Sequence, residues 1–503
     1  MSAPPPQPAP RRRSRGTTGK RRRRLINTSP DTEPASLNWL DRLKRDARTG
    51  VGGLFVSGLF HTALLIIGAL ILIASVEDPV ILPLDVGWLT AADQTTEEKQ
   101  PLYAPVELPN TPREVEPTTP TPTPDQEPED PPPIVRRVTP VDVSDALRNR
   151  GLGRNPLPEN SEHNEDAQRA IEKALSWLSR QQQQDGRWSL HEGYPNPGSI
   201  KTDTGATALA LLAFLGTGQT HQGGEYQQVI AKGLDWLRNN QRPSGDLFDL
   251  VEQGKEAHFY AHSQGTIAIC EALALTGDPD LTEPAQRAVD FLTAAQNPVK
   301  GGWKYRPLNE TGVGDLSVTG WALMALHTAR MAGIEVSPET YLLASSFLDS
   351  VQESPVEDAF YKYRPDWAAE ESQRWSMTAE GLLCRQWLGW EREDPSLQRG
   401  VRFLLSERNT PEWKHGRRNL YAWYYTAQTL HNMGGDDWTA WYLSVQSEIV
   451  SQQASDGSWH PTRPAGVPLE YASSAGRLYI TVLSVLILET PYRHAPIYEK
   501  DAG

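Results

Sequence analysis

The chain has 503 residues and a formal net charge of −14, with 63 Asp and Glu against 49 Lys and Arg. This length allows two or three domains, and an acidic chain is a poor nucleic-acid binder because phosphate contacts need clustered Lys and Arg. Its two cysteines, Cys270 and Cys384, cannot build a disulfide framework or a zinc knuckle, and both lie in apolar helical patterns typical of core positions.

Residues 1–53 form a basic segment that we expect to be a disordered cytoplasmic tail. The segment holds thirteen Lys and Arg against four Asp and Glu, with arginine runs at 11–13 and 21–24. Such a tail could contact RNA or anionic lipid. Beside a membrane span its commoner role is to set the orientation of that span, which we favour.

The uncharged stretch 54–76 predicts one transmembrane helix. It reads LFVSGLFHTALLIIGALILIASV, and about twenty apolar residues span a bilayer core. A cleaved signal peptide would have a shorter apolar stretch and a shorter basic region. Basic residues precede the span, and Glu77 and Asp78 follow it. The positive-inside rule therefore predicts a single-pass protein of the cytoplasmic membrane, with its N-terminus in the cytoplasm and the rest periplasmic or otherwise extracytoplasmic.

His61 is an ionisable residue inside the predicted span, and Ser57 lies one helical turn before it on the same face. This Ser-x-x-x-His pair, in a single helix followed by a Pro-rich stretch, resembles the anchor of TonB-type energy-transducing proteins. The resemblance covers about thirty residues and implies docking against an ExbB/ExbD-like proton-motive motor. The alternative is that His61 packs or snorkels near the lipid headgroups.

Residues 77–160 read as an acidic, Pro-rich linker. Thirteen prolines fall within 101–140, and proline fixes φ and removes the amide donor, so neither helix nor sheet is expected there. Polyproline II geometry makes this stretch a semi-rigid spacer that holds the C-terminal domain away from the bilayer.

From 161 to 495 the sequence repeats, and 496–503 is expected to be a short tail. Each unit has an amphipathic helix that ends near a Gln-like residue, followed by a helix that is apolar almost all round. The unit ends are Gln182, Gln241, Gln296, Gln352, Arg408 and Gln453. Helices that are apolar on every side must be buried, so six such pairs predict a closed α/α toroid with the apolar helices inside. An open solenoid is the competing architecture, but its helices would share their exposure more evenly.

A Gln-x-x-x-Gly-x-Trp pattern connects the two helices of a unit. It is clear at 182–188 and 453–459, it recurs at 296–303 with one more residue as Gln-x-x-x-x-Gly-Gly-Trp, and it is degenerate at 241–247. The glycine can end the helix, the Gln can bond freed backbone groups and the Trp can pack against a neighbouring pair. The pattern resembles the QW-type repeat of the prenyltransferase and squalene-cyclase superfamily. This resemblance is specific for the fold and not for an activity.

In such toroids the N-termini of the inner helices surround a cavity, and their dipoles suit acids there. The catalytic candidates are therefore Asp203, His262 and Asp315, although an Asp at a helix start is more often an N-cap. Aromatic residues near the same helix ends could line a ligand pocket, or could be ordinary core: Tyr260, Trp321, Tyr421 and Trp423.

The signatures of the enzymes that share this ring are missing. The D-x-D-D-T acid motif of squalene-hopene-type cyclases is reduced to Asp203 within 200–204, which argues against polyene cyclisation. Neither cysteine has an Asp two residues away, so a prenyltransferase zinc site is not expected, and no cofactor is implied. The Cys-Gly-Glu-Gln run of complement-like thioester proteins is absent.

Two classes of function remain. The first is a binding or scaffold module that uses the ring cavity or its rim. The second is a toroid enzyme acting on a terpenoid or a glycan, of the squalene-hopene cyclase, prenyltransferase or carbohydrate-active kind. A structural role in a TonB-like transport assembly is a third possibility. The expected partners are the membrane, ExbB/ExbD-like proteins and an isoprenoid or glycan ligand, without nucleic acid.

Overall fold

The computed structural model describes residues 161–498, except 250, 309–310 and 354–358, together with Val138, Pro140, Leu147 and Arg150. For 161–164 only the backbone is described. All of these residues belong to one of two compact units of the chain, 85–503. The predicted tail 1–53 and span 54–76, with Ser57 and His61, lie outside the described residues. Within the described part, no helix is both long and apolar enough to cross a bilayer.

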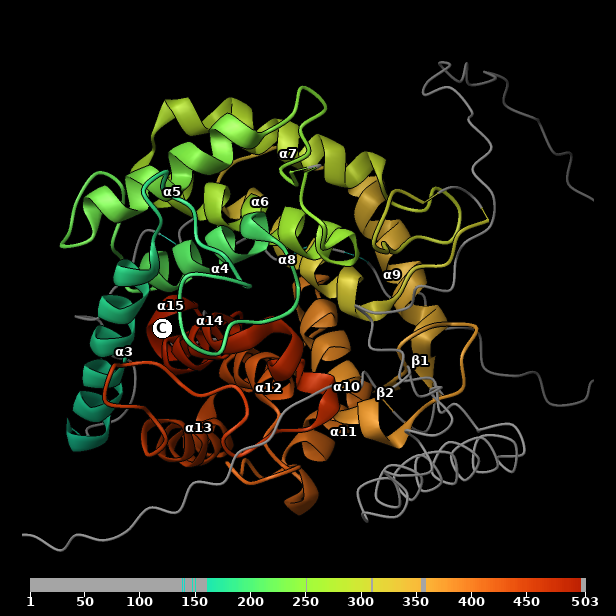
Figure 1. Ribbon diagram of the computed structural model, residues 1–503. Helices are drawn as coiled ribbons and strands as arrows, with labels where there is room; N and C mark the ends of the chain where they lie inside the picture. The colour runs from blue at the N-terminus through green and yellow to red at the C-terminus, as the bar shows by residue number, and fades with distance from the viewer. Residues whose placement is uncertain are drawn as a thin grey trace, which may run out of the picture. The chain divides into compact units, whose positions relative to one another are not determined.

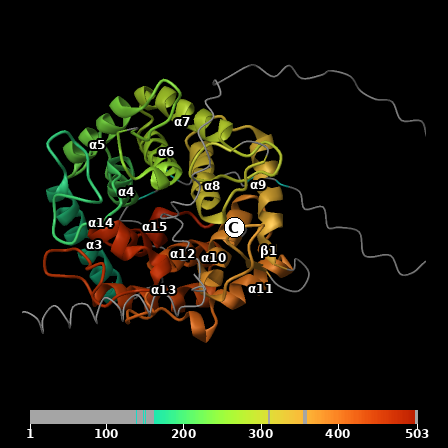
Figure 2. The ribbon, with the colours of Figure 1, turned by 45° about the vertical axis from the view of Figure 1, so that its right-hand side comes forward.

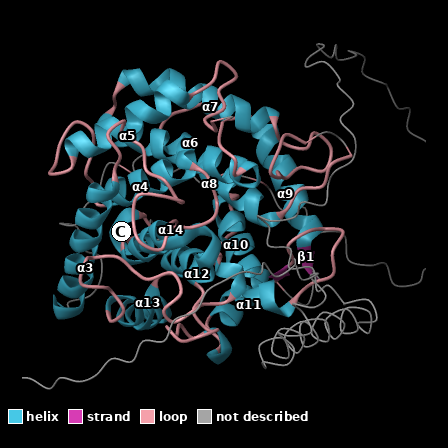
Figure 3. Ribbon diagram, viewed as in Figure 1, coloured by secondary structure: helices cyan, strands magenta, loops and turns pink. Residues whose placement is uncertain are grey.

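Six helix pairs make up the ring, as Figures 1 and 3 show. The first helix of each pair lies on the outside: α3 (Ser161–Gln181), α5 (Gln227–Asn240), α7 (Thr282–Ala294), α9 (Pro338–Val351), α11 (Pro395–Leu404) and α13 (Gly435–Val450). The second lies inside: α4 (Asp203–Gly216), α6 (His258–Thr276), α8 (Leu316–Met331), α10 (Glu371–Trp387), α12 (Leu420–Met433) and α14 (Ala472–Leu488). The described residues also form short elements: η1 (Lys255–Ala257), η2 (Pro279–Leu281), η3 (Glu407–Asn409), η4 (Pro468–Glu470), α15 (Thr490–Arg493), β1 (Gln352–Glu353) and β2 (Phe360–Tyr361).

The inner helices close on themselves. Each contacts the next along the chain, and the last, α14, returns to contact the first, α4. The outer helix α13 likewise meets α3, so the seam is closed in both layers (Figure 2). The predicted closed α/α toroid is therefore confirmed, and the open solenoid is excluded.

The burial of the two layers follows the sequence pattern. Every residue of α12 is buried, and so is every residue of α4 after Asp203. By contrast, α5 buries only Ile230, Gly233, Leu234 and Leu237, which recur at the spacing of one helical face. Apolar inner helices are thus surrounded by amphipathic outer ones, which is the arrangement that removes the most apolar surface from water.

The Gln-Gly-Trp pattern joins neighbouring pairs. The Nε2 of Gln182 donates to the carbonyl oxygens of Gly186 at 2.9 Å and of Val229 in α5 at 2.8 Å. The Nε1 of the buried Trp188 donates to the carbonyl of Leu178 at 2.7 Å. Gln241 and Gln453 make the same two bonds, and Gln296 reaches the carbonyl of Thr340 in α9.

The fourth pair departs from the pattern. A tyrosine, Tyr361 in β2, takes the place of the Trp, and its backbone N–H donates to Oγ1 of Thr378 at 3.2 Å. In the first pair the corresponding bond runs from the N–H of Trp188 to Thr207 at 2.9 Å. Strand β2 pairs antiparallel with β1, so the longer connection after α9 forms a small hairpin before it rejoins the repeat.

Candidate functional site

A pocket lies at the N-terminal ends of α8, α10 and α12, and we call it the tyrosine pocket. It encloses about 330 Å³, including its open mouth. Hydroxyl, amide and aromatic groups dominate its wall, which consists of Ser317, Tyr363, Gln373, Ser376, Met377, Tyr421, Leu469 and Tyr471. The predicted ligand residue Tyr421 is therefore in the wall of a pocket.

A buried carboxyl group lies behind Ser317. Oδ1 of Asp315 accepts hydrogen bonds from the hydroxyl of Ser317 at 2.9 Å and from the backbone N–H of Val318 at 2.9 Å. Asp315 is thus the N-cap of α8, and the hydroxyl of Tyr260 lies 2.6 Å from that of Ser317. Burial raises the pKa of Asp315 to about 6, against the effect of these hydrogen bonds. Two predicted residues, Tyr260 and Asp315, therefore meet at Ser317.

A second buried acid, Glu380 of α10, lies behind Tyr421. The Tyr421 hydroxyl is 3.2 Å from Oε2 of Glu380, and the side chain is fully buried. Burial raises the pKa of Glu380 well above its ordinary value, hydrogen bonds from Tyr425 and Tyr421 oppose the shift, and the charge of Asp315 adds to it. Glu380 therefore binds a proton more tightly than an exposed glutamate does, and phenol groups hydrogen-bond to its carboxyl group.

The far wall of the pocket depends on a buried ion pair. Arg418 and Glu470 are both fully buried, and Nε of the arginine lies 2.8 Å from Oε1 of the glutamate. Oε2 of Glu470 also accepts from the backbone N–H of Leu420, the first residue of α12. Tyr471, which follows Glu470 in the sequence, has a left-handed backbone conformation with φ of 58°, and this conformation is uncommon for a tyrosine. Such strain persists only where the surrounding structure enforces it.

Aromatic side chains fill the axis of the ring below this pocket. Trp321 of α8 stacks on Tyr424 of α12 at 5.7 Å between ring centroids and meets Tyr425 edge-on at 6.4 Å. The Tyr424 hydroxyl reaches Sδ of Met324 at 3.3 Å. Because α8 and α12 are separated along the ring by α10, these contacts cross its interior. We call Trp321, Tyr424 and Tyr425 the aromatic plug.

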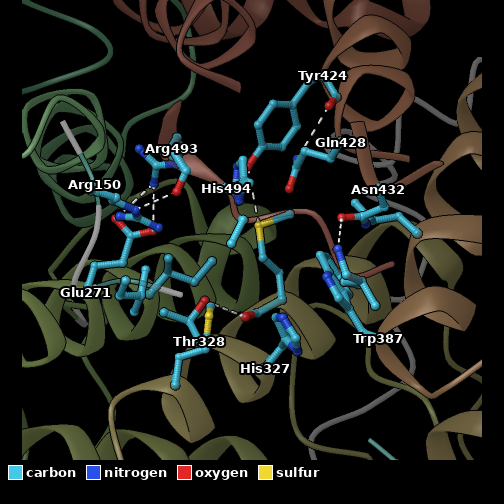
Figure 4. Close-up of a pocket in the computed structure, with 17 residues that line it drawn as sticks. Arg150, Glu271, His327, Thr328, Trp387, Tyr424, Gln428, Asn432, Arg493 and His494 are labelled. Atoms are coloured by element: carbon cyan, nitrogen blue, oxygen red, sulfur yellow. Dashed lines mark hydrogen bonds and ion pairs between the residues drawn. The ribbon is translucent and has the colours of Figure 1, made fainter. Parts of the chain in front are cut away.

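A larger pocket of about 610 Å³ lies on the other side of the plug, at the C-terminal ends of the inner helices (Figure 4). We call it the arginine pocket, because Arg150 and Arg493 line it together with Glu271. Successive turns of one helix serve both pockets. On α12, Tyr421 lines the tyrosine pocket, Tyr424 belongs to the plug, and Gln428 lines the arginine pocket.

The other predicted site residues lie elsewhere. Asp203 is the first residue of α4, where Oδ2 pairs with Nε of Arg187 at 2.9 Å, while Thr202 is the N-cap. Trp423 is fully buried beside Trp413. Asp203, His262 and Trp423 line neither pocket. The structure therefore does not bring together the three catalytic candidates, which are Asp203, His262 and Asp315.

His262 occupies a structural position of the repeat. Its Nδ1 accepts from the backbone N–H of Leu247 at 3.2 Å, and its Nε2 lies 3.0 Å from the carbonyl oxygen of Ala288. In other pairs a threonine, such as Thr207 or Thr319, accepts the corresponding backbone N–H. This histidine must be neutral to accept at Nδ1.

The neutral state of His262 predicts acid sensitivity. Burial, with a smaller effect of the nearby His258, lowers the pKa of His262 to about 3. The unfolded chain therefore binds the proton more tightly, and stability must fall as pH falls from about 6.5, by up to about 1.4 kcal/mol per pH unit for such a group. Replacing this residue by threonine, His262→Thr, should flatten the pH dependence of urea unfolding between pH 7 and 4.5. An unchanged slope would contradict the assignment.

The residues that sequence reasoning missed are Ser317 and Glu380 near the tyrosine pocket, and Arg150, Glu271 and Arg493 at the arginine pocket. A carboxylate within a largely apolar run, as at Glu271 in α6, is a signal that could have indicated that group. In the described part of the chain, no three His, Cys, Asp or Glu side chains gather as metal ligands.

Comparisons with known proteins found one family model and a set of solved structures that resemble this chain. A family model described as the squalene-hopene cyclase C-terminal domain matches residues 159–262, which include the first pair, α5 and the start of α6. Among solved structures, the type II terpene cyclase MstE from Scytonema in complex with geranylgeranyl dihydroxybenzoate is 14% identical, with a TM-score of 0.44, over 67% of this chain and 99% of the cyclase. The α-1,6-mannanase GH76A from Salegentibacter sp. HEL1_6 is 11% identical, with a TM-score of 0.46, over 65% of this chain and 98% of the mannanase. A search of curated proteins gave no match.

Proposed function

We propose that this chain is a membrane-anchored, extracytoplasmic binding module that holds a ligand in the tyrosine pocket. The aromatic plug carries the proposal. A long isoprenoid needs one continuous chamber, whereas Trp321 and Tyr424 meet across the axis and leave two blind pockets. In the part of the chain that the structure describes, the ring thus offers the end of a ligand a place at either face, in two separate pockets and not in one long chamber.

The wall of the tyrosine pocket supports a hydroxyl-bearing ligand such as a glycan. Ser317 and Ser376 place hydroxyl groups in the wall, and Gln373 places an amide there. Three tyrosines supply aromatic rings. Sites that orient a small polar ligand typically have a small number of polar groups that converge among aromatic surfaces. The terminal sugar of a glycan chain is our proposed occupant.

Isothermal titration with soluble α- and β-linked tetrasaccharides tests this proposal on the full chain. At least one linkage should bind, and Met377→Trp should abolish the binding because the indole would fill the pocket. The matched control is Leu342→Trp, which places the same side chain on an exposed position of α9, where Leu342 is 56% exposed. Absence of binding by every tetrasaccharide, or full binding by Met377→Trp, would refute a glycan site here.

An acid-catalysed reaction on a glycan or terpenoid is the second candidate function. It is favoured by the two buried acids, Asp315 and Glu380, because each is one hydrogen bond behind a residue of the pocket wall and both have raised pKa values. Turnover of any tetrasaccharide or of a polyprenyl substrate, lost in Asp315→Asn with folding retained, would favour the enzyme over the binding module.

The membrane location and its motor partner are part of the same proposal. The stretch 54–76 would anchor the ring on the extracytoplasmic side, and the Ser57 and His61 pair would face an ExbB/ExbD-like complex. Reporter fusions before residue 54 and after residue 503 test the orientation. Co-purification with ExbB/ExbD-like proteins should be lost in a Ser57→Ala, His61→Ala double variant, and its persistence would remove the motor from the proposal.

A further inference from the structure

The arginine pocket is built from parts far apart in the sequence. Met324 and Met331 come from α8, Leu383 and Trp387 from α10, and Ile267 from α6, so one side of the pocket is mainly apolar. The remaining wall comes from further residues of α6, α8 and α12, from Arg493 of α15 with the chain after it, and from Leu147 and Arg150 before the ring. Its volume of about 610 Å³ includes the open space at its mouth.

Three charged groups gather at one side of this pocket (Figure 4). Nη2 of Arg150 lies 2.9 Å from Oε1 of Glu271, and Nη2 of Arg493 lies 2.8 Å from the same oxygen and 2.9 Å from Oε2. Nε of Arg150 also donates to the carbonyl of Arg493 at 2.7 Å. Two guanidinium groups thus share one carboxylate, and this corner of the pocket has an excess of positive charge.

The next acid does not neutralise that excess. Glu489 lies outside the pocket wall and contacts Nη1 of Arg493 at 3.3 Å. Burial raises the pKa of Glu489 to about 8, although both arginines oppose the shift, so the group is mostly uncharged at neutral pH. Glu271 is ionised, because the charges of Arg150 and Arg493 outweigh burial and lower its pKa.

Two buried nitrogen atoms of the pocket wall have no hydrogen-bond partner among the described residues. They are Nε of Arg493 and Nε2 of His494. The Arg493 side chain is only 2% exposed. Buried polar groups in folded proteins are almost always satisfied, so the N–H at Nε of Arg493 calls for an acceptor from outside the described residues.

We propose that the arginine pocket binds a single-chain amphiphile with an anionic head group, a carboxylate or a phosphate ester. The head lies at the corner formed by Arg150 and Arg493, and the apolar chain lies along Met324, Met331 and Trp387. Arg150 belongs to the segment before the ring, so that segment supplies part of the site. This inference is independent of the proposed glycan ligand, because the aromatic plug separates the two pockets.

Titration of the full chain with four ten-carbon probes tests the proposal: decanoate, decyl phosphate, decanol and decyltrimethylammonium, each below its self-assembly concentration. The two anions should bind and raise the unfolding temperature, and the uncharged and cationic probes should not. Binding of decanoate alone would indicate a fatty-acid-type ligand, and binding of decyl phosphate alone would indicate a lipid-phosphate-type ligand. Equal binding by decanol, or no binding by either anion, would overturn the proposal.

Variants locate the site. Arg150→Gln should weaken anion binding about tenfold or more, because it removes a charge-assisted contact while Glu271 stays paired with Arg493. Met331→Trp should block binding by filling the apolar side. Arg402→Gln removes one positive charge from an exposed position of α11 and should bind as the unaltered chain does. Unchanged binding by both Arg150→Gln and Met331→Trp, with each variant folded by circular dichroism, would place the amphiphile elsewhere.

Discussion

Replacing Glu470 by leucine should reduce the free energy of unfolding by about 3–5 kcal/mol, because it leaves the Arg418 guanidinium buried without its anion. Both side chains are fully buried, and the guanidinium otherwise contacts the backbone carbonyls of His460 and Pro461 and the ring of Trp413, which are uncharged groups. The change also removes the acceptor for the Leu420 N–H at the start of α12. Urea unfolding of the full chain, followed by circular dichroism, measures the loss.

A double variant distinguishes the effect of an unpaired buried charge on stability from the effect of altered packing. Arg418→Met combined with Glu470→Leu replaces both charges with apolar groups and should recover a large part of the lost stability. The surface pair of Glu165 and Arg169 provides the control, since both side chains are more than half exposed and Glu165→Gln should change little. If the double variant were less stable than Glu470→Leu alone, the charge argument would fail.

Replacing Gly457 by alanine should destabilise the ring by at least about 3 kcal/mol, because strain and a steric clash coincide at one position. Gly457 has φ of 98°, and a Cβ there would collide with the backbone carbonyl of Lys173 in α3. Gln453 bonds the carbonyls of both Gly457 and Ala170 across the same seam. The clash therefore forces apart the two outer helices that complete the ring, α13 and α3.

The same substitution at a second glycine, Gly193, measures the cost of backbone strain without a steric clash. Gly193 has φ of 95° but no atom within 4 Å of an added Cβ, so Gly193→Ala should cost only about 1–2 kcal/mol. Thermal unfolding of both variants measures the difference. Equal losses at the two positions would show that the seam yields without cost, and the tight closure described here would then be wrong.

The ring itself could be predicted from the sequence because it follows from the need to bury the apolar helices. Runs that are apolar all round, such as 204–216, must be enclosed, and the amphipathic pattern of 227–240 shows which helices enclose them. The cap at Asp315 and the place of Tyr421 at an inner-helix end followed from the same pattern.

The interior of the ring could not be predicted in the same way. Helical periodicity places Trp321 on an inner helix but does not give its rotation toward Tyr424, which lies on a helix that is not its neighbour. Similarly, the isolated Glu271 in an apolar run predicts some buried partner, yet Arg150 and Arg493 are 121 and 222 residues away. Long-range pairings of this kind depend on the finished packing.

The seam between α13 and α3 has a consequence for how the repeats relate to one another. Every inner helix has an inner neighbour on each side, so the six pairs form a cycle in which no pair is terminal in space. Repeat arrays that stay open need special polar end units to protect their cores from solvent, and this cycle needs none. A circular permutant, cut in a surface connection such as 219–225 and rejoined across the seam, would bury the same faces in the same order.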